Sequence, residues 1–255
     1  MSDGQGNDFK ILIAVHKPHW VPKDSVYYPV CVGSRIHETE WGKQYASDNT
    51  GDHISDKNPY YCELTAMYWA WKNLSCDYIG LCHYRRYFVK DIVGLPLHIF
   101  KERDFRDDLK EADVILPKKM ELTETVYEQY ASMHHREDMD HVRRIIEEQT
   151  PEFLDSFDTV MQQKSAYFTN MFCMRKRDYD EYCAWLFSVL ASLEECVDLT
   201  TYDDYQKRIY GFMAERLLNV WIQKKEYRVK EEQIIIFDEK AVMHRAMDAL
   251  RKILN

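Results

Sequence analysis

Short apolar runs alternate along the chain with longer segments in which apolar residues recur at helical spacing. The runs are compact and bounded by polar residues, glycine or proline, which is typical of buried strands; they cover residues 9–16, 28–32, 79–82, 113–116, 166–174 and 233–237. Helical spacing follows most of them, at residues 61–73, 104–111, 123–157, 175–195, 205–225 and 241–254. Strands separated by helices predict an α/β sandwich with a mainly parallel central sheet and extra helices.

The long polar segment Gly33–Pro59 interrupts this alternation. Loops of that length inside a compact domain are usually functional or disordered. No internal repeat and no low-complexity stretch divides the chain, so we expect a single domain over residues 1–255. The charged segment at about 121–160 has helical spacing and is the candidate for a helical lid or an acceptor subdomain.

Composition narrows the class of protein. The chain has 255 residues and a formal net charge of -9, with a pI of about 5.6. Non-specific attraction to nucleic acid is therefore not expected, and basic residues must act locally. The seven cysteines are scattered without a CxxC pair, which favours reduced thiols in a cytoplasmic protein over disulfides or a zinc site. No apolar run has the length of a membrane span, so any membrane contact is expected to be peripheral.

The segment Tyr78–Phe88, YIGLCHYRRYF, carries the most specific chemistry. Its apolar run ends abruptly at His83, and Arg85 and Arg86 follow two residues later. Ligands of open α/β sheets lie just beyond the carboxyl ends of strands. Because the planar, permanently charged guanidinium fork matches phosphate oxygens, two arginines there indicate a phosphorylated ligand. Pairing with acidic side chains is the structural alternative.

Several familiar catalytic motifs are absent from the chain. GxGxxG after the first strand, GxxxxGK[ST], HExxH and GxSxG do not occur, which argues against a dehydrogenase, a P-loop kinase, a zincin and an α/β-hydrolase. No Asp-x-Asp closes an apolar strand in the first half of the chain. Arginine and lysine can neutralise a leaving diphosphate as a divalent metal does, so we expect neither a metal nor another cofactor.

Three blocks, SDKNPYYCELTAMYWAWKN, DYIGLCHYRRYF and RIYGFMAERLLNVW, closely resemble a family of bacterial capsular, exopolysaccharide and O-antigen glycosyltransferases. The family was long catalogued as a domain of unknown function, and some members resemble galactofuranosyltransferases. The resemblance extends from about Lys10 to Trp221. It implies a GT-A-like nucleotide-binding domain without a classical metal motif.

The resemblance also implies an activity. We expect transfer of a hexose, with galactofuranose as one candidate, from a UDP-sugar to a lipid-linked oligosaccharide at the cytoplasmic membrane face. Metal-independent, inverting transfer is the expected mechanism. The alternative is a non-catalytic nucleotide- or saccharide-binding module of a polysaccharide assembly complex.

Candidate donor-binding residues follow strands or precede helices. His16 and Lys17 end the first run, where nucleotide-sugar enzymes usually meet base and ribose, although a solvated loop end is equally consistent. The remaining candidates are Lys57, Asn58, His83, Arg85, Arg86, Asn170 and Arg208. Asn58 could instead cap the following helix, and His83 could be a structural histidine.

Two carboxylates are candidate bases for an inverting transfer, because a base must reach the acceptor hydroxyl. Glu215 lies in the first turns of a long helix, as the base of inverting GT-A enzymes often does, with an ion pair to Arg208 or Arg216 as the alternative. Asp138 lies in the polar HHRED patch beside His134 and His135. We assign these two histidines to the acceptor site, with a solvated helix face as the alternative.

Overall fold

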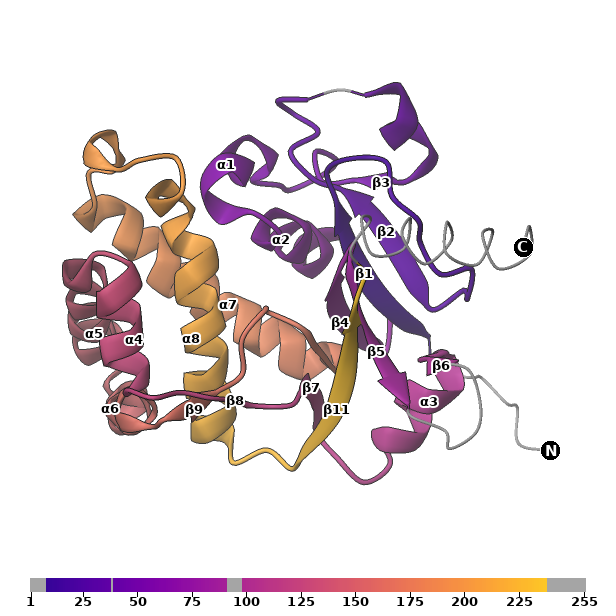
Figure 1. Cartoon of the computed structure of the whole chain (residues 1–255). Helices are drawn as coiled ribbons and strands as arrows, with labels where there is room; N and C mark the ends of the chain where they lie inside the picture. The colour runs from indigo at the N-terminus through magenta and orange to yellow at the C-terminus, as the bar shows by residue number, and fades with distance from the viewer. Residues whose placement is uncertain (1–7, 38, 91–97, 238–255) are drawn as a thin grey trace, which may run out of the picture.

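The computed structural model of the protein describes residues 8–37, 39–90 and 98–237, which form eleven strands and eight α-helices (Figure 1). The strands are β1 (Phe9–Val15), β2 (Tyr27–Cys31), β3 (Ala46–Ser47), β4 (Tyr78–His83), β5 (Arg86–Lys90), β6 (His98–Ile99), β7 (Val114–Pro117), β8 (Met120–Glu121), β9 (Ser165–Ala166), β10 (Phe172–Arg175) and β11 (Val229–Ile236). The helices are α1 (Asn58–Tyr61), α2 (Leu64–Asn73), α3 (Glu102–Asp108), α4 (Val126–Met133), α5 (Arg136–Gln149), α6 (Leu154–Gln162), α7 (Lys176–Cys196) and α8 (Ile209–Lys225).

Nine strands make one mixed sheet in the order β3-β2-β1-β4-β10-β7-β11-β5-β6. β3, β2, β1 and β4 are parallel, whereas β10 is antiparallel to both β4 and β7. β11 is parallel to β7 and antiparallel to β5, and β5 also pairs with β4, so five strands close into a small barrel.

The predicted α/β class is confirmed, but the expectation of a mainly parallel sheet is wrong for the barrel half. The chain between β7 and β10 leaves and re-enters the sheet at the same edge, because α5 packs on α7 and α6 packs on α8, with α4 against α5 and α6, instead of crossing the sheet. β5 is antiparallel because a tight hairpin joins it to β4.

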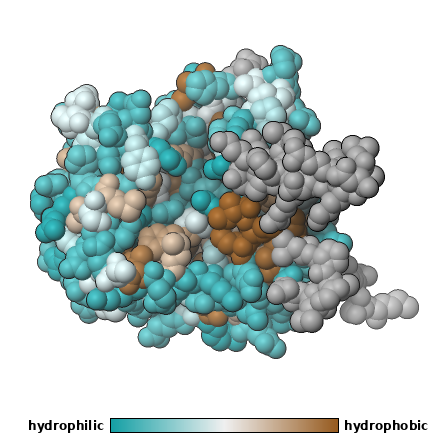
Figure 2. Space-filling model, viewed as in Figure 1, coloured by the Kyte–Doolittle hydropathy of each residue, from teal (hydrophilic) through white to brown (hydrophobic). Residues whose placement is uncertain are grey.

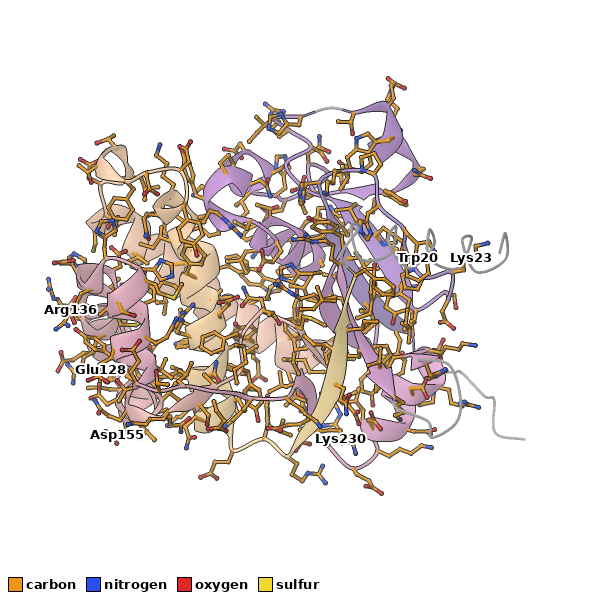
Figure 3. All side chains as sticks on the ribbon, in the orientation of Figure 1. Trp20, Lys23, Glu128, Arg136, Asp155 and Lys230 are labelled. Atoms are coloured by element: carbon orange, nitrogen blue, oxygen red, sulfur yellow. The ribbon has the colours of Figure 1, made fainter. Side chains whose placement is uncertain are left out.

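The two faces of the sheet are covered by different elements. Alternate residues of β1 point to opposite faces, as strand geometry requires. Leu12 joins the large core under α2, α7 and α8, whereas Ile11 and Ile13 join a smaller core that includes Phe105 of α3. In Figure 1 the outer helices α4–α6 lie on the far side of α8 from the sheet. Figure 3 places Glu128, Arg136 and Asp155 on these helices, and Trp20 and Lys23 beside the sheet.

Most of the predicted elements are present. The helix expected over 61–73 is divided into α1 and α2, because Cys62 between them has a left-handed φ of 53°. The segment 123–157 forms α4, α5 and the start of α6, and its role as a lid or acceptor subdomain stays a prediction. The helix predicted over 241–254 lies outside the described residues. β5 was not predicted, since it begins at Arg86 itself, with only two residues between it and the end of β4.

Asp48 organises the long segment between β2 and α1. Its side chain is completely buried and accepts four hydrogen bonds, from the backbone N–H groups of Gly33 (2.9 Å) and Ser34 (3.1 Å) and from the hydroxyls of Ser55 (2.5 Å) and Thr65 (2.7 Å). These hydrogen bonds offset the cost of burying a charged carboxylate away from water. Asp48 fastens the turn after β2 to the start of α2.

Figure 2 shows a largely hydrophilic surface, with apolar surface gathered near the middle of this face over β11. There Ile236 leaves 59% of its surface exposed. The helices α4 and α8 approach the sheet beside this area, and the cavities described next lie nearby.

Candidate active site

A cavity of about 520 Å³ lies at the carboxyl ends of β1, β2 and β4, which share one edge of the sheet because they are parallel. We call it the strand-end cavity. Residues from the strand ends, from the starts of α1 and α2, from the β4–β5 turn and from the turn before α8 line it: Ala14, His16, Val32, Asn58, Cys62, Glu63, His83, Tyr84, Arg85, Arg86 and Arg208. This is the sheet edge at which the sequence predicted a ligand.

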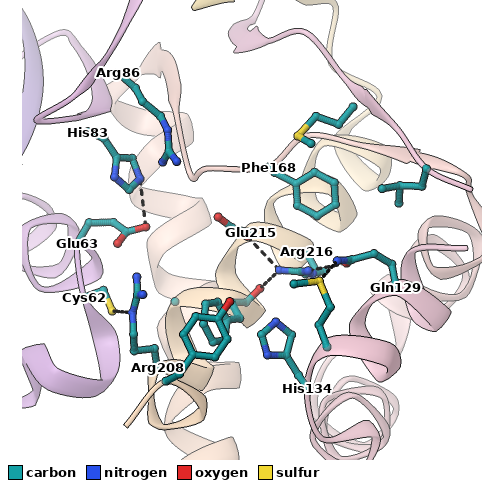
Figure 4. A pocket seen from close by; sticks show the side chains of 16 residues that line it. Cys62, Glu63, His83, Arg86, Gln129, His134, Phe168, Arg208, Glu215 and Arg216 are labelled. Carbon is teal, nitrogen blue, oxygen red and sulfur yellow. Dashed lines mark hydrogen bonds and ion pairs between the residues drawn. The ribbon is translucent and has the colours of Figure 1, made fainter. Parts of the chain in front are cut away.

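A second cavity of about 440 Å³ lies between the sheet edge and the helices α4 and α8 (Figure 4). We call it the helical cavity. Its wall is largely apolar and aromatic, with Met120, Phe168, Tyr205 and Phe212 among its lining residues. Five residues line both cavities and define the junction between them: Cys62, Glu63, His83, Arg86 and Arg208.

Arg85 and Arg86 supply the positive charge of the strand-end cavity. They lie at the hairpin turn where His83 of β4 pairs with Arg86 of β5. Arg85 is exposed and lies 5.1 Å from the ring centre of Tyr84. Within the described part of the chain neither arginine pairs with a carboxylate, so both guanidinium groups are available to an anion.

Two histidines beside these arginines have lowered pKa values. Burial lowers the pKa of His16 below 6.5, and the neighbouring charges of Lys17 and Arg85 lower it further. Burial also lowers the pKa of His83, against the opposing effect of Glu63. Both rings are therefore neutral at pH 7, and the His83 Nε2 lies 2.9 Å from the Thr169 carbonyl oxygen, to which it donates in the matching tautomer.

Two carboxylates face the cavities. Glu63 precedes α2; its Oε1 accepts a hydrogen bond from Asn170 Nδ2 (2.9 Å) and lies 3.6 Å from His83 Nε2. Glu215 of α8 lines the helical cavity, with Oε1 bound to the Thr169 N–H (3.0 Å) and Oε2 paired with Arg216 (2.9 Å). Burial raises the pKa of Glu215, although Arg216 opposes this effect.

Strained backbone surrounds these carboxylates. Four non-glycine residues of the described ranges have positive φ, and three of them lie here: Cys62 (53°), Thr169 (85°) and Asn170 (51°). Such conformations cost about 1–3 kcal/mol each and persist only where the surroundings enforce them, commonly at functional sites. The backbone strain is therefore a second indication, independent of the charges, that the junction is a functional site.

Most predicted donor residues converge on the strand-end cavity. His16, His83, Arg85, Arg86 and Arg208 line it, and their role in donor binding stays a prediction. Arg208 also donates from Nε to Cys62 Sγ (3.2 Å), which fixes it across the junction.

Other predicted donor residues are engaged by the protein itself. Asn58 lines the strand-end cavity, but its Nδ2 donates to the Cys62 carbonyl (2.8 Å). Lys57 lines neither cavity and pairs with Glu194 (2.6 Å). Lys17 lies with its Nζ 5.5 Å from the ring centre of Tyr84 and lines neither cavity. Asn170 is buried and lines neither cavity, but it donates a hydrogen bond to Glu63, which lines both.

The predicted acceptor patch is divided by the structure. His134 lines the helical cavity and stacks on Phe212, with ring centres 4.2 Å apart. His135 instead stacks on Tyr202 and lines neither cavity. Asp138 is buried away from both cavities, where its oxygens accept hydrogen bonds from Tyr202 (2.6 Å) and Tyr130 (3.3 Å). The structure therefore does not bring Asp138 to the site.

Sequence reasoning missed several residues of the helical cavity. Arg216 is buried and connects Glu215 to Gln129 of α4, whose Oε1 accepts from its Nη2 (2.7 Å). Glu63 lies within the SDKNPYYCELTAMYWAWKN block and Phe168 within the apolar run 166–174, but neither residue was singled out. The sequence pointed to Arg216 only as an ion-pair partner of Glu215, a pairing that the structure contains, and not as a residue that lines a cavity.

The described ranges 8–37, 39–90 and 98–237 contain neither a metal-binding cluster nor a membrane-spanning helix. No group of three or more His, Cys, Asp or Glu side chains is arranged there to hold a metal ion. None of the helices in these ranges is both long and apolar enough to cross a membrane.

Comparison with known proteins gives two matches. The family model described as "Domain of unknown function (DUF4422)" matches residues 10–226. The solved structure of the WbbM bifunctional glycosyltransferase in its apo form is 34% identical, with a TM-score of 0.80, over 91% of this chain. The match covers 46% of the WbbM chain, so this chain spans about half the length of that protein. None of the curated proteins matches the chain.

Proposed function

The chain belongs to the DUF4422 family, as its three sequence blocks predicted, and we propose that it is a glycosyltransferase. The observation that carries the proposal is the arginine pair in the strand-end cavity. This cavity shares a junction, which includes the carboxylate of Glu63, with the helical cavity. The likeness to a bifunctional glycosyltransferase supports the same activity.

We assign the donor to the strand-end cavity, in a GT-A-like manner. A UDP-sugar would place its diphosphate against Arg85 and Arg86, with His16 toward the nucleoside. The guanidinium groups would stabilise the charge that develops on the leaving UDP, the task that a divalent metal performs in other transferases. In this proposal no metal is required.

We assign the acceptor to the helical cavity. Aromatic and apolar walls suit the faces of sugar rings, and His134 and Gln129 offer polar contacts. The acceptor class that we propose is a lipid-linked saccharide of capsule, exopolysaccharide or O-antigen synthesis, met at the cytoplasmic membrane face. The transferred sugar is a hexose, with galactofuranose as the leading candidate, and the transfer is inverting.

The activity is tested by incubating the purified chain with UDP-galactofuranose, UDP-galactose or UDP-glucose and a galactose-terminated alkyl glycoside. We expect UDP release that increases with acceptor, together with a product heavier by one hexose in mass spectrometry. Saturable donor binding without UDP release or product would instead favour the non-catalytic binding module.

Donor binding is expected to take up protons at acid pH. The free protein holds the pKa of His16 below 6.5, and a bound diphosphate would bring negative charge that raises it again. The affinity for UDP-galactose should therefore increase as the pH falls from 7 to about 5.5. Titration calorimetry at about pH 6, in buffers of different ionisation enthalpy, measures this uptake. The His16→Ala variant should take up fewer protons, with the remainder taken up by His83 of the same cavity, and equal uptake in that variant would contradict the assignment.

A further inference from the structure

We infer that Glu63 is the catalytic base of the transfer, and that the Glu215–Arg216 pair positions the site instead of taking the proton. This inference rests on the proposed function and deepens it. Its first support is position. Glu63 lines both cavities, whereas Glu215 lines only the helical cavity, in which Figure 4 shows both side chains. A base must reach the acceptor hydroxyl where it meets the donor sugar, which is the junction.

The second support is the availability of a carboxylate oxygen. Glu63 Oε1 is held by Asn170, and its Oε2 accepts no hydrogen bond within the described part of the chain. Both oxygens of Glu215 are engaged, one by a backbone N–H and one by Arg216. Taking up a proton at Glu215 would break a buried ion pair, because the Arg216 side chain is only 4% exposed.

The third support is that Glu63 is held rigidly in place. Cys62, immediately before it, adopts the left-handed φ that divides α1 from α2 and turns Glu63 toward the junction. Asn170, also at positive φ, donates one amide hydrogen to Glu63 and directs the other to the Gly211 carbonyl of α8 at 3.3 Å. Strained backbone and a buried amide thus fix one oxygen and leave the other open.

The step conserves atoms and charge. The acceptor hydroxyl oxygen forms a bond to the anomeric carbon while the bond from that carbon to the diphosphate oxygen breaks, and its electron pair leaves with UDP. Glu63 Oε2 takes the hydroxyl proton. Arg86, which lines the same junction, lies where it can stabilise the departing diphosphate.

The test compares glutamate variants with UDP-galactofuranose and UDP-galactose as donors and an alkyl galactoside as acceptor. Glu63→Gln keeps an oxygen for Asn170 but removes the base, so kcat should fall at least 100-fold while UDP affinity and melting temperature change little. Glu63→Asp should recover part of the activity. Glu148→Gln, an exposed control on α5, should match wild type.

Glu215→Gln should behave differently. It leaves Arg216 buried without its partner, so the melting temperature should fall by about 5–10 °C, while kcat stays at least ten times that of Glu63→Gln. The inference is overturned if Glu63→Gln keeps its kcat, or if Glu215→Gln loses more. If the wild-type protein releases no UDP and forms no product, the proposed glycosyltransferase function is contradicted, and the assignment of Glu63 as its base is contradicted as well.

Discussion

Replacing Arg85 and Arg86 together by alanine is expected to weaken UDP binding by about 100-fold. Each guanidinium can make charge-assisted hydrogen bonds to the diphosphate, worth about 1.5–3 kcal/mol each, so losing one from each arginine costs roughly 3 kcal/mol or more. The two arginines have no carboxylate partner in the described ranges, so their removal leaves no buried charge of the protein unpaired. The fold should therefore survive the change.

The control for this double variant removes the same charge elsewhere. Arg103→Ala/Arg144→Ala changes two exposed arginines that line neither cavity, so it should bind UDP as wild type does. A general effect of net charge would weaken both double variants alike. Equal affinities of the Arg85/Arg86 variant and wild type would show that the diphosphate does not lie at the strand ends.

Asp48→Ala is expected to destabilise the protein by about 4 kcal/mol or more. It removes a buried acceptor from four donors, and an unsatisfied buried donor costs about 1–3 kcal/mol. For a domain of this size the melting temperature should fall by about 8–16 °C. Thermal unfolding followed by circular dichroism measures the change.

Asp56→Ala is the matched control, because Asp56 is exposed in the same segment and carries the same charge. Its melting temperature should stay within about 1 °C of wild type, as for surface substitutions in general. If the two variants unfold at similar temperatures, Asp48 does not organise the segment after β2.

Most of the candidate donor residues lie together in the strand-end cavity because strand ends are local features of the sequence. The apolar runs before His16 and His83 end abruptly, and parallel neighbours place such ends at one edge. Their order in the sheet was not predictable, because an apolar run does not encode its direction. The antiparallel β10 and the β4–β5 hairpin therefore appear only in the structure.

The helical cavity was predicted less completely because its lining depends on helix rotation and on backbone strain. Helical spacing did not show that His134 would face a cavity while His135 and Asp138 pack on tyrosines. Glu63 was missed because the segment 61–73 reads as one continuous helix. Only the left-handed Cys62, which nothing in its residue type signals, turns Glu63 to the junction.

The proposed function requires a nucleotide-sugar donor bound by arginine at the strand ends, and titration of UDP into the wild-type chain tests this most directly. The titration is made first in EDTA and then with Mn²⁺. We predict saturable binding in EDTA with an affinity that Mn²⁺ leaves unchanged. Binding that appears only with Mn²⁺, or no binding of UDP under either condition, would contradict the account.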